Sequence, residues 1–183
     1  APPVSRRAVA ILIVLGLLTF SKFIYMAALT SFYTFYLIET FGVSVSTSQL
    51  LLFVFLGAVA LGTFVGGPIG DRYGRRAVIL VSILGVLPFT VALPHVGLTA
   101  AAVLTFIIGI VNASAFSAIL VYGQSLMPGR VGLVSGMFFG FAFGVAGIGA
   151  AALGVLADAT SIAYVFEICG YLPAIGVLVF FLP

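Results

Sequence analysis

The sequence predicts an all-α polytopic membrane protein with six transmembrane helices, and three observations support this fold class. First, 63% of the 183 residues are hydrophobic and only 6% are charged, whereas soluble domains average about 25% charged residues. Second, six apolar segments each reach the roughly 20 residues that a helix needs to cross a bilayer. Third, these segments lack the polar and apolar alternation of a membrane β-barrel, so helices are the state that satisfies their backbone hydrogen bonds.

We expect the six spans at about residues 9–38, 48–69, 77–93, 98–122, 131–157 and 162–182, together forming a single domain over residues 1–183. The breaks between them carry turn residues. A serine-rich turn follows the first span, with Ser46 or Thr47 as the expected N-cap of the second helix. Proline and glycine separate the third span from the fourth, and the fourth from the fifth.

The basic residues predict how the spans are oriented. Arginines precede the first span and occupy the turns after the second and fourth spans, whereas the turns after the first, third and fifth spans contain no lysine or arginine. Basic residues gather on the cytoplasmic side of membrane proteins. This pattern therefore predicts that the N-terminus, both arginine-containing turns and the C-terminus are cytoplasmic.

The charge and cysteine content argue against several other classes of protein. The net charge is +3 and the isoelectric point is about 9.3, but the arginines lie in short turns between apolar spans, so no nucleic-acid partner is expected. One cysteine, one histidine and four acidic residues leave too few ligands for a metal centre, and no cofactor is expected. The chain begins with Ala-Pro-Pro and not with methionine, which suggests a fragment or a processed product.

The most specific motif is GGPIGDRYGRR, residues 66–76, between the second and third spans. Its glycines allow two helices and a short connection to approach closely. Asp71 suits the N-terminus of a neighbouring helix, and the arginines suit helix carbonyls or anionic lipid headgroups. A plain cytoplasmic turn is the alternative interpretation of each arginine taken singly.

The spacing G-x-x-x-D-R-x-G-R-R resembles the loop signature of the major facilitator superfamily, which joins the second and third helices of each six-helix half. The resemblance implies that Asp71 docks against the start of the fifth helix, here residues 130–133, as a conformational latch. It also implies that the chain is one half of a twelve-helix transporter whose pathway runs between its halves. The residues that match the signature are Gly67, Asp71, Arg72, Gly74, Arg75 and Arg76.

Four longer strings narrow the resemblance to one branch of the superfamily. They are FSKFIYMAALTSFYTFYLIETFGVS (20–44), VSILGVLPF (81–89), SAFSAILVYGQ (114–124) and SGMFFGFAFGVAGIGAAALGVLAD (135–158), and they are similar to the C-terminal half of fosmidomycin-resistance-type efflux proteins. The resemblance implies a proton-coupled drug exporter of the bacterial inner membrane that works by alternating access on fosmidomycin-like or other small amphipathic or anionic substrates. Its implied partners are the lipid bilayer, the N-terminal six-helix half, a small-molecule drug and protons.

Lys22 is the most informative residue inside the predicted spans, because a lysine at mid-membrane costs about 2.5–3.5 kcal/mol. On a helix it lies on one stripe with Tyr25, Tyr33 and Tyr36. This stripe suits an aqueous cavity for an anionic or amphipathic ligand; the alternative is that Lys22 snorkels or pairs with the other half. Asn112 in the fourth span is a further candidate for substrate binding, with an interhelical hydrogen bond as its alternative role.

Two other features lead to functional hypotheses. Glu167 in the sixth span is a candidate proton site, although a structural role is favoured because sixth helices lie peripheral to the cavity in this superfamily. The fifth span carries three overlapping GxxxG units, which allow helix backbones to touch. We expect this stripe to pack closely against a neighbouring helix, with homodimerisation as the weaker alternative; it comprises Gly132, Gly136, Gly140 and Gly144.

The sequence does not predict an enzyme. Ser135 lies near the predicted cytoplasmic start of the fifth span, whereas the chain's histidine, His95, lies in a predicted outer turn. A serine and a histidine on opposite sides of a membrane cannot form a catalytic dyad. The remaining alternative to a transporter is an isolated six-helix scaffold or self-associating, channel-like module without transport of its own.

Overall fold

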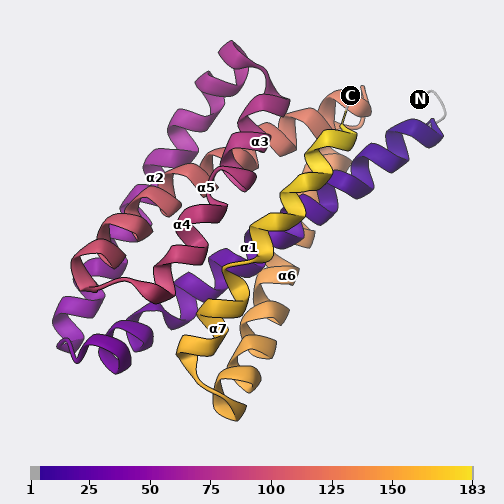
Figure 1. The fold of residues 1–183 in the computed structure, drawn as a ribbon. Helices are drawn as coiled ribbons and strands as arrows, with labels where there is room; N and C mark the ends of the chain where they lie inside the picture. The colour runs from indigo at the N-terminus through magenta and orange to yellow at the C-terminus, as the bar shows by residue number, and fades with distance from the viewer. Residues whose placement is uncertain (1–4, 183) are drawn as a thin grey trace.

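The computed structural model describes residues 5–182, and within this range it contains helices and turns but no strand (Figure 1). The all-α prediction is therefore confirmed. The elements in chain order are α1 (Arg6–Phe41), α2 (Val45–Tyr73), α3 (Arg75–Leu84), α4 (Leu87–Ala92), the 3-10 helix η1 (Leu93–His95), α5 (Leu98–Leu126), α6 (Val131–Ala159), α7 (Ile162–Cys169) and the 3-10 helix η2 (Leu172–Phe181).

Six helical stretches are long and apolar enough to cross a membrane. Four are the single helices α1, α2, α5 and α6, and two are composite, covering Arg75–His95 and Ile162–Phe181. Proline accounts for part of this division, because Pro88 and Pro94 each lie in the first turn of a new helical segment, as does Pro173 at η2. The expected spans are thus present, with ends that differ from the prediction by a few residues.

The start of α2 is capped by Ser44, and not by Ser46 or Thr47. Its backbone is extended, with φ −66° and ψ 156°, and its hydroxyl accepts a hydrogen bond from the Thr47 backbone nitrogen at 3.2 Å. Ser46 and Thr47 already lie inside the first helical turn, where a residue no longer has the extended backbone of an N-cap. The predicted cap was therefore two or three residues too late.

The connection between α2 and α3 is shorter than predicted. Helix α2 continues through Asp71 and Arg72 to Tyr73, with Pro68 in its interior, and Gly74 alone separates it from α3. Gly74 has φ +90° and ψ 139°, a region that disfavours residues with a side chain. The second span was expected to end at about residue 69, and the helix runs about four residues further because helical hydrogen bonding persists up to a one-residue joint.

The ends of the helices are sorted between the two ends of the bundle. Figure 1 shows the described N- and C-terminal ends of the chain on the same side as the α2–α3 joint and the turn between α5 and α6. The α1–α2 and α6–α7 turns lie at the opposite side. All six arginines therefore lie near one end of the bundle. This agrees with the predicted orientation, in which the arginine-containing segments all lie on one side of the membrane.

The packing leaves two helices with large exposed faces. In α2 and α6, 22% and 17% of the most apolar window is buried, whereas the other four spans reach 39–44%. Helix α2 packs along α5, and α6 packs mainly along α1, but α2 and α6 do not pack along each other. These are the faces of the bundle for which the described residues provide no neighbour.

Candidate functional site

The candidate site is centred on Lys22, roughly halfway along α1. Its side chain is only 4% exposed. The ammonium nitrogen Nζ lies 5.0 Å from the centroid of the Phe23 ring and 5.3 Å from that of Phe116 on α5. Both distances fall within the roughly 6 Å over which an aromatic face attracts a cation. The two rings therefore hold the charged end of Lys22 at the contact between α1 and α5.

No carboxylate compensates this charge within the part of the chain that the structure describes. The four acidic residues are Glu39, Asp71, Asp158 and Glu167, and all four are exposed. No ion pair joins Lys22 to another residue among positions 5–182. A buried cation without a counter-ion is unfavourable, and intramembrane lysines mark ligand or ion pathways by default. An anionic ligand is the chemical group that would complete this site.

Aromatic rings connect Lys22 to the surface of the bundle. Phe116 is in edge contact with Phe139 on α6, with centroids 5.2 Å apart, and Phe139 stacks on Phe143 at 6.3 Å. Exposure rises along this row, from the partly buried Phe116 to 41% for Phe139 and 69% for Phe143. The row thus runs from the buried ammonium to the exposed face of α6.

A second set of polar groups lies along the same contact between α1 and α5. Tyr33 on α1 and Thr105 on α5 share a hydrogen bond of 2.9 Å between their hydroxyl oxygens. Tyr33 lies eleven residues after Lys22 and Thr105 eleven residues before Phe116, so the two helices keep one antiparallel register between these contacts. In that register Asn112 lies at the level of the turn of α1 that holds Tyr25.

Tyr25 and Asn112 share an unusual property. Tyr25 is 1% exposed and Asn112 is 2% exposed. Within the described residues the Tyr25 hydroxyl oxygen and the Asn112 Nδ2 have no hydrogen-bond partner. Buried polar atoms nearly always have partners, and leaving one unpaired costs about 1–3 kcal/mol. Among residues 5–182 the amide nitrogen of Asn112 therefore makes no interhelical hydrogen bond in this conformation. The alternative role of Asn112 stays a prediction.

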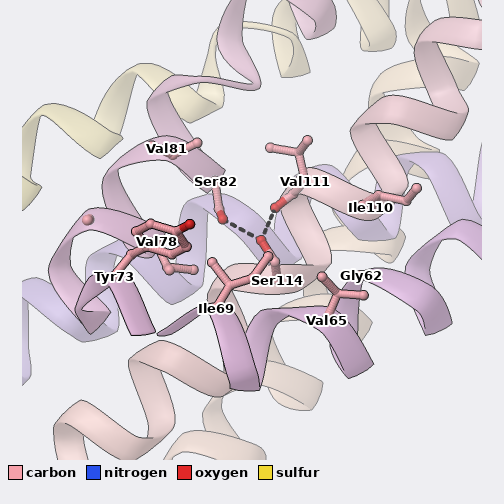
Figure 2. Close-up of a pocket in the computed structure, with 11 residues that line it drawn as sticks. Gly62, Val65, Ile69, Tyr73, Val78, Val81, Ser82, Ile110, Val111 and Ser114 are labelled. Carbon is pink, nitrogen blue, oxygen red and sulfur yellow. Dashed lines mark hydrogen bonds between the residues drawn. The ribbon is translucent and has the colours of Figure 1, made fainter. Parts of the chain in front are cut away.

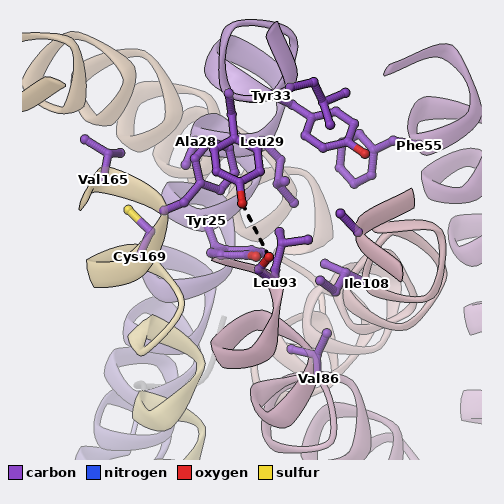
Figure 3. Packing of buried hydrophobic residues seen from close by; sticks show 14 residues of the cluster. Tyr25, Ala28, Leu29, Tyr33, Phe55, Val86, Leu93, Ile108, Val165 and Cys169 are labelled. Atoms are coloured by element: carbon purple, nitrogen blue, oxygen red, sulfur yellow. Dashed lines mark hydrogen bonds between the residues drawn. The ribbon is translucent and has the colours of Figure 1, made fainter. Parts of the chain in front are cut away.

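The tyrosine stripe lies on one face of α1, as predicted, but that face does not border an open cavity. Tyr25, Tyr33 and Tyr36 are 0–1% exposed and belong to one hydrophobic core with side chains from α2, α5 and α7 (Figure 3). Tyr36 packs on the Phe166 ring with centroids 4.6 Å apart and donates a long hydrogen bond to the Leu93 carbonyl. The expectation of an aqueous stripe is corrected, because neighbouring helices cover it.

The signature residues lie at the arginine-rich end. Asp71 is exposed and borders a hollow with Arg75, Tyr122 and Ser125 at the end of α5. No hydrogen bond or ion pair between described residues joins Asp71 to residues 130–133, so the expected docking is not formed here. Gly67 is partly buried and Arg72 lies over the Tyr73 ring at 5.6 Å. The latch itself stays a prediction.

The remaining candidates lie on the outside of the bundle. Glu167 is exposed on α7. The glycines of the α6 stripe are also exposed, and a Cβ added to any of Gly132, Gly136, Gly140 or Gly144 would meet no described atom within 4 Å. Close packing of this stripe against another helix of the same chain was therefore wrong. A partner outside the chain stays a prediction.

Sequence reasoning missed an apolar pocket of about 410 Å³ between α2, α3 and α5 (Figure 2). Its floor holds Ser82 and Ser114, whose hydroxyls hydrogen-bond to each other across α3 and α5. Because these hydroxyls satisfy each other, the pocket offers an apolar surface. The sequence does show a serine in the third span and several in the fourth, and these could have suggested a polar contact between the two helices. It does not show which serines lie close enough to form a hydrogen bond.

Residues 5–182 thus form a bundle of six apolar helices, each long enough to cross a membrane, with Lys22 buried between α1 and α5. Residues 11–183 match the family model of the Major Facilitator Superfamily. The chain belongs to this superfamily, which confirms the resemblance inferred from the signature residues. As the superfamily consists of transporters, the prediction that the chain is not an enzyme is supported at the level of the family.

Three relatives add detail. The chain is 57% identical over 182 residues to the fosmidomycin resistance protein of Escherichia coli (strain K12), covering 99% of this chain and 45% of that protein. It is 45% identical over 156 residues to an uncharacterized MFS-type transporter of Bacillus subtilis (strain 168), covering 85% and 38%. It is 32% identical over 186 residues to a 4-hydroxybenzoate transporter of Acinetobacter baylyi, covering 99% and 40%. The chain thus spans less than half the length of these relatives.

Proposed function

We propose that this chain is the C-terminal six-helix half of a proton-coupled drug exporter, with Lys22 binding the anionic group of the substrate. The observation that carries the proposal is the buried ammonium with no carboxylate partner among residues 5–182. Fosmidomycin-like phosphonates and other small anionic or amphipathic drugs are the proposed substrates. The 57% identity to a fosmidomycin resistance protein supports this substrate class.

The aromatic row supports a route to Lys22. Phe139 and Phe143 are exposed on α6, and Phe116 links them to the ammonium. We propose that the substrate enters along these rings from the side where the other half docks, and that its anion displaces the ring contacts of Lys22. An anion offers the ammonium charge-assisted hydrogen bonds, which neither phenylalanine ring can provide.

The other polar candidates fall into two groups. Tyr25 and Asn112 carry unpaired polar atoms, so a substrate that opens the α1–α5 contact gains a hydrogen bond from each. Tyr33 and Tyr36 already have partners in Thr105 and the Leu93 carbonyl. We therefore propose that Tyr25 and Asn112 contribute more to substrate binding than Tyr33 and Tyr36 do.

Alternating access requires the N-terminal half of the transporter, and proton coupling requires a side chain that binds and releases a proton. We propose that the exposed faces of α2 and α6 meet the N-terminal half in a bacterial inner membrane, with both ends of this chain in the cytoplasm. The Asp71 signature acts in this proposal as a latch for a conformation other than the present one. Glu167 is the candidate proton site within the chain.

Substitution of Lys22 tests the proposed function. In the full-length protein, Lys22→Met should lower resistance to fosmidomycin at least tenfold, since a hydrogen-bonded charge contributes about 1.5–3 kcal/mol. Lys22→Arg, which keeps the charge, is the matched control and should retain part of the resistance. Membrane levels of each variant are measured by immunoblot. Full resistance in Lys22→Met at normal protein levels would eliminate the proposed role.

Expression of separate halves tests the scaffold alternative. Cells that produce this chain alone should stay drug-sensitive, and co-expression with the N-terminal half should restore resistance. Resistance from this chain alone would show a self-sufficient module and contradict the half-transporter proposal.

A further inference from the structure

A hollow of about 690 Å³ opens at the arginine-rich end of the bundle, away from Lys22. Three elements bound it: the first turns of α1, the start of α3 and the end of η2. Two arginines lie at it, Arg7 from α1 and Arg76 from α3, and both are exposed. It therefore brings together two positive charges from segments that lie far apart in the sequence.

Arg76 is held in position by the end of η2. Its Nη2 donates a hydrogen bond of 3.3 Å to the carbonyl oxygen of Phe180. A guanidinium carries five N–H donors in a planar fork, so most of its donors stay free for an anion. Such a fork is suited to the oxygens of a phosphate.

The charged side chains that line this hollow, Arg7 and Arg76, are both positive. None of the side chains from residues 5–182 that line it is acidic. The neighbouring hollow beside the α2–α3 joint, which Arg76 also borders, is different because Asp71 lines it. The hollow between Arg7 and Arg76 thus has two positive charges with no acidic side chain among its described lining residues, whereas Asp71 offsets one of the two arginines of the other hollow.

The walls of this hollow are apolar. Ile11 and Val14 line it from α1, and Leu178 and Phe181 line it from η2. Phe181 is 72% exposed, so the hollow continues into a face that lipid covers when the helices span a membrane. A free phosphate would gain nothing from these walls, whereas an acyl chain would bury apolar surface on them.

We propose that this groove binds an anionic phospholipid, with its phosphodiester between Arg7 and Arg76 and an acyl chain along Val14 and Phe181. Basic pockets between transmembrane helices at a membrane surface bind such headgroups. The lipid bridges α1, α3 and η2, three elements from the beginning, middle and end of the chain. The proposal is independent of Lys22 and of the drug that is transported.

Lipid binding to the purified full-length protein tests this proposal. Native mass spectrometry from detergent, with added dioleoyl phosphatidylglycerol or dioleoyl phosphatidylcholine, gives the affinity of each lipid. We expect preference for phosphatidylglycerol, and about fivefold weaker binding in Arg7→Gln and in Arg76→Gln, since a basic residue near an anionic surface contributes about 1 kcal/mol. Arg76→Lys keeps the charge but not the planar fork, and it should retain part of the binding. Gel filtration identifies any variant that fails to fold.

Arg6→Gln is the matched control, because Arg6 precedes Arg7 in α1 but does not line the groove. It should change binding less than twofold. Equal loss in Arg6→Gln and Arg7→Gln would show diffuse attraction to a charged surface and overturn the site. Equal binding of the two lipids would also overturn it, as would glycerol phosphate competing as well as the intact lipid. Absence of bound phosphatidylglycerol on the wild-type protein would overturn it as well.

Discussion

The glycines of α2 and the glycines of α6 share a four-residue spacing but have different surroundings. Gly62, Gly66 and Gly70 of α2 are buried against α5, where they lie beside Ile110, Ser114 and Ala118. Residue numbers increase in the same direction along both helices at this contact, so α2 and α5 run parallel. The four glycines of the α6 stripe instead face away from the described part of the chain.

This difference shows what a glycine stripe encodes. Removing side chains allows two backbones to approach closely, and α2 uses this space: a Cβ added to Gly66 would lie 2.7 Å from the Ser114 Cα. On α6 the same spacing leaves a groove with no neighbour inside the chain. The spacing therefore predicts a capacity for close packing, while the position of the helix in the bundle determines which partner can use it.

The largest expected effect is at the buried stripe. Gly66→Ala should destabilise the bundle by about 3 kcal/mol, because the added methyl group overlaps helix backbone that cannot rotate away. Thermal unfolding is measured with a thiol-reactive fluorophore, since Cys169, the one cysteine of the chain, is buried on α7. An unchanged unfolding temperature would show that the α2–α5 contact can separate at little cost.

A smaller effect is expected at Ser114, the residue beside Gly66, whose hydroxyl joins α5 to α3. Ser114→Ala removes the hydroxyl that bonds to Ser82 but leaves the backbone that Gly66 touches. Hydrogen bonds between transmembrane helices contribute about 0.6 kcal/mol on average, so the unfolding temperature should fall only slightly. A loss as large as that of Gly66→Ala would mean that the hydroxyl pair between α3 and α5 contributes as much to stability as the backbone contact between α2 and α5.

The smallest effect on stability is expected at the exposed stripe. Gly140→Ala makes the same chemical change as Gly66→Ala but meets open space, so stability should change by less than about 0.5 kcal/mol. Drug resistance of the full-length protein is the second readout, and it should fall if the other half packs on α6. Unfolding of Gly140→Ala at a much lower temperature would contradict the comparison.

The spans and their order could be predicted because they depend on length and composition alone. Which helices pack against each other could not be predicted from the sequence, and Lys22 and the tyrosines of α1 illustrate this. Helical periodicity predicts correctly that these side chains share a face, but a face lined with hydroxyls is compatible with water or with a polar core. Only the positions of α5 and α7 decide between the two, and those depend on contacts between residues far apart in the sequence.

Packing also determines how far α2 continues into the signature motif. Glycine, proline and charge within residues 66–76 indicate a turn in water, but a helix can continue through them in a membrane protein because neighbouring groups satisfy the backbone. Gly74 is different because its positive φ needs the absence of a Cβ. Local composition indicates where a helix can end. The packing of α2 on α5 extends α2 up to Gly74.

The position of Lys22 has a consequence for biogenesis. The ribosome delivers α1 to the translocon well before it has made α5, so the ammonium must enter the bilayer when Phe116 does not yet exist. Phe23, on the same helix, is the one of its two aromatic contacts available during that interval. Nascent α1 is therefore held in lipid by its long apolar flanks, and the arrival of α5 completes the shelter of the charge.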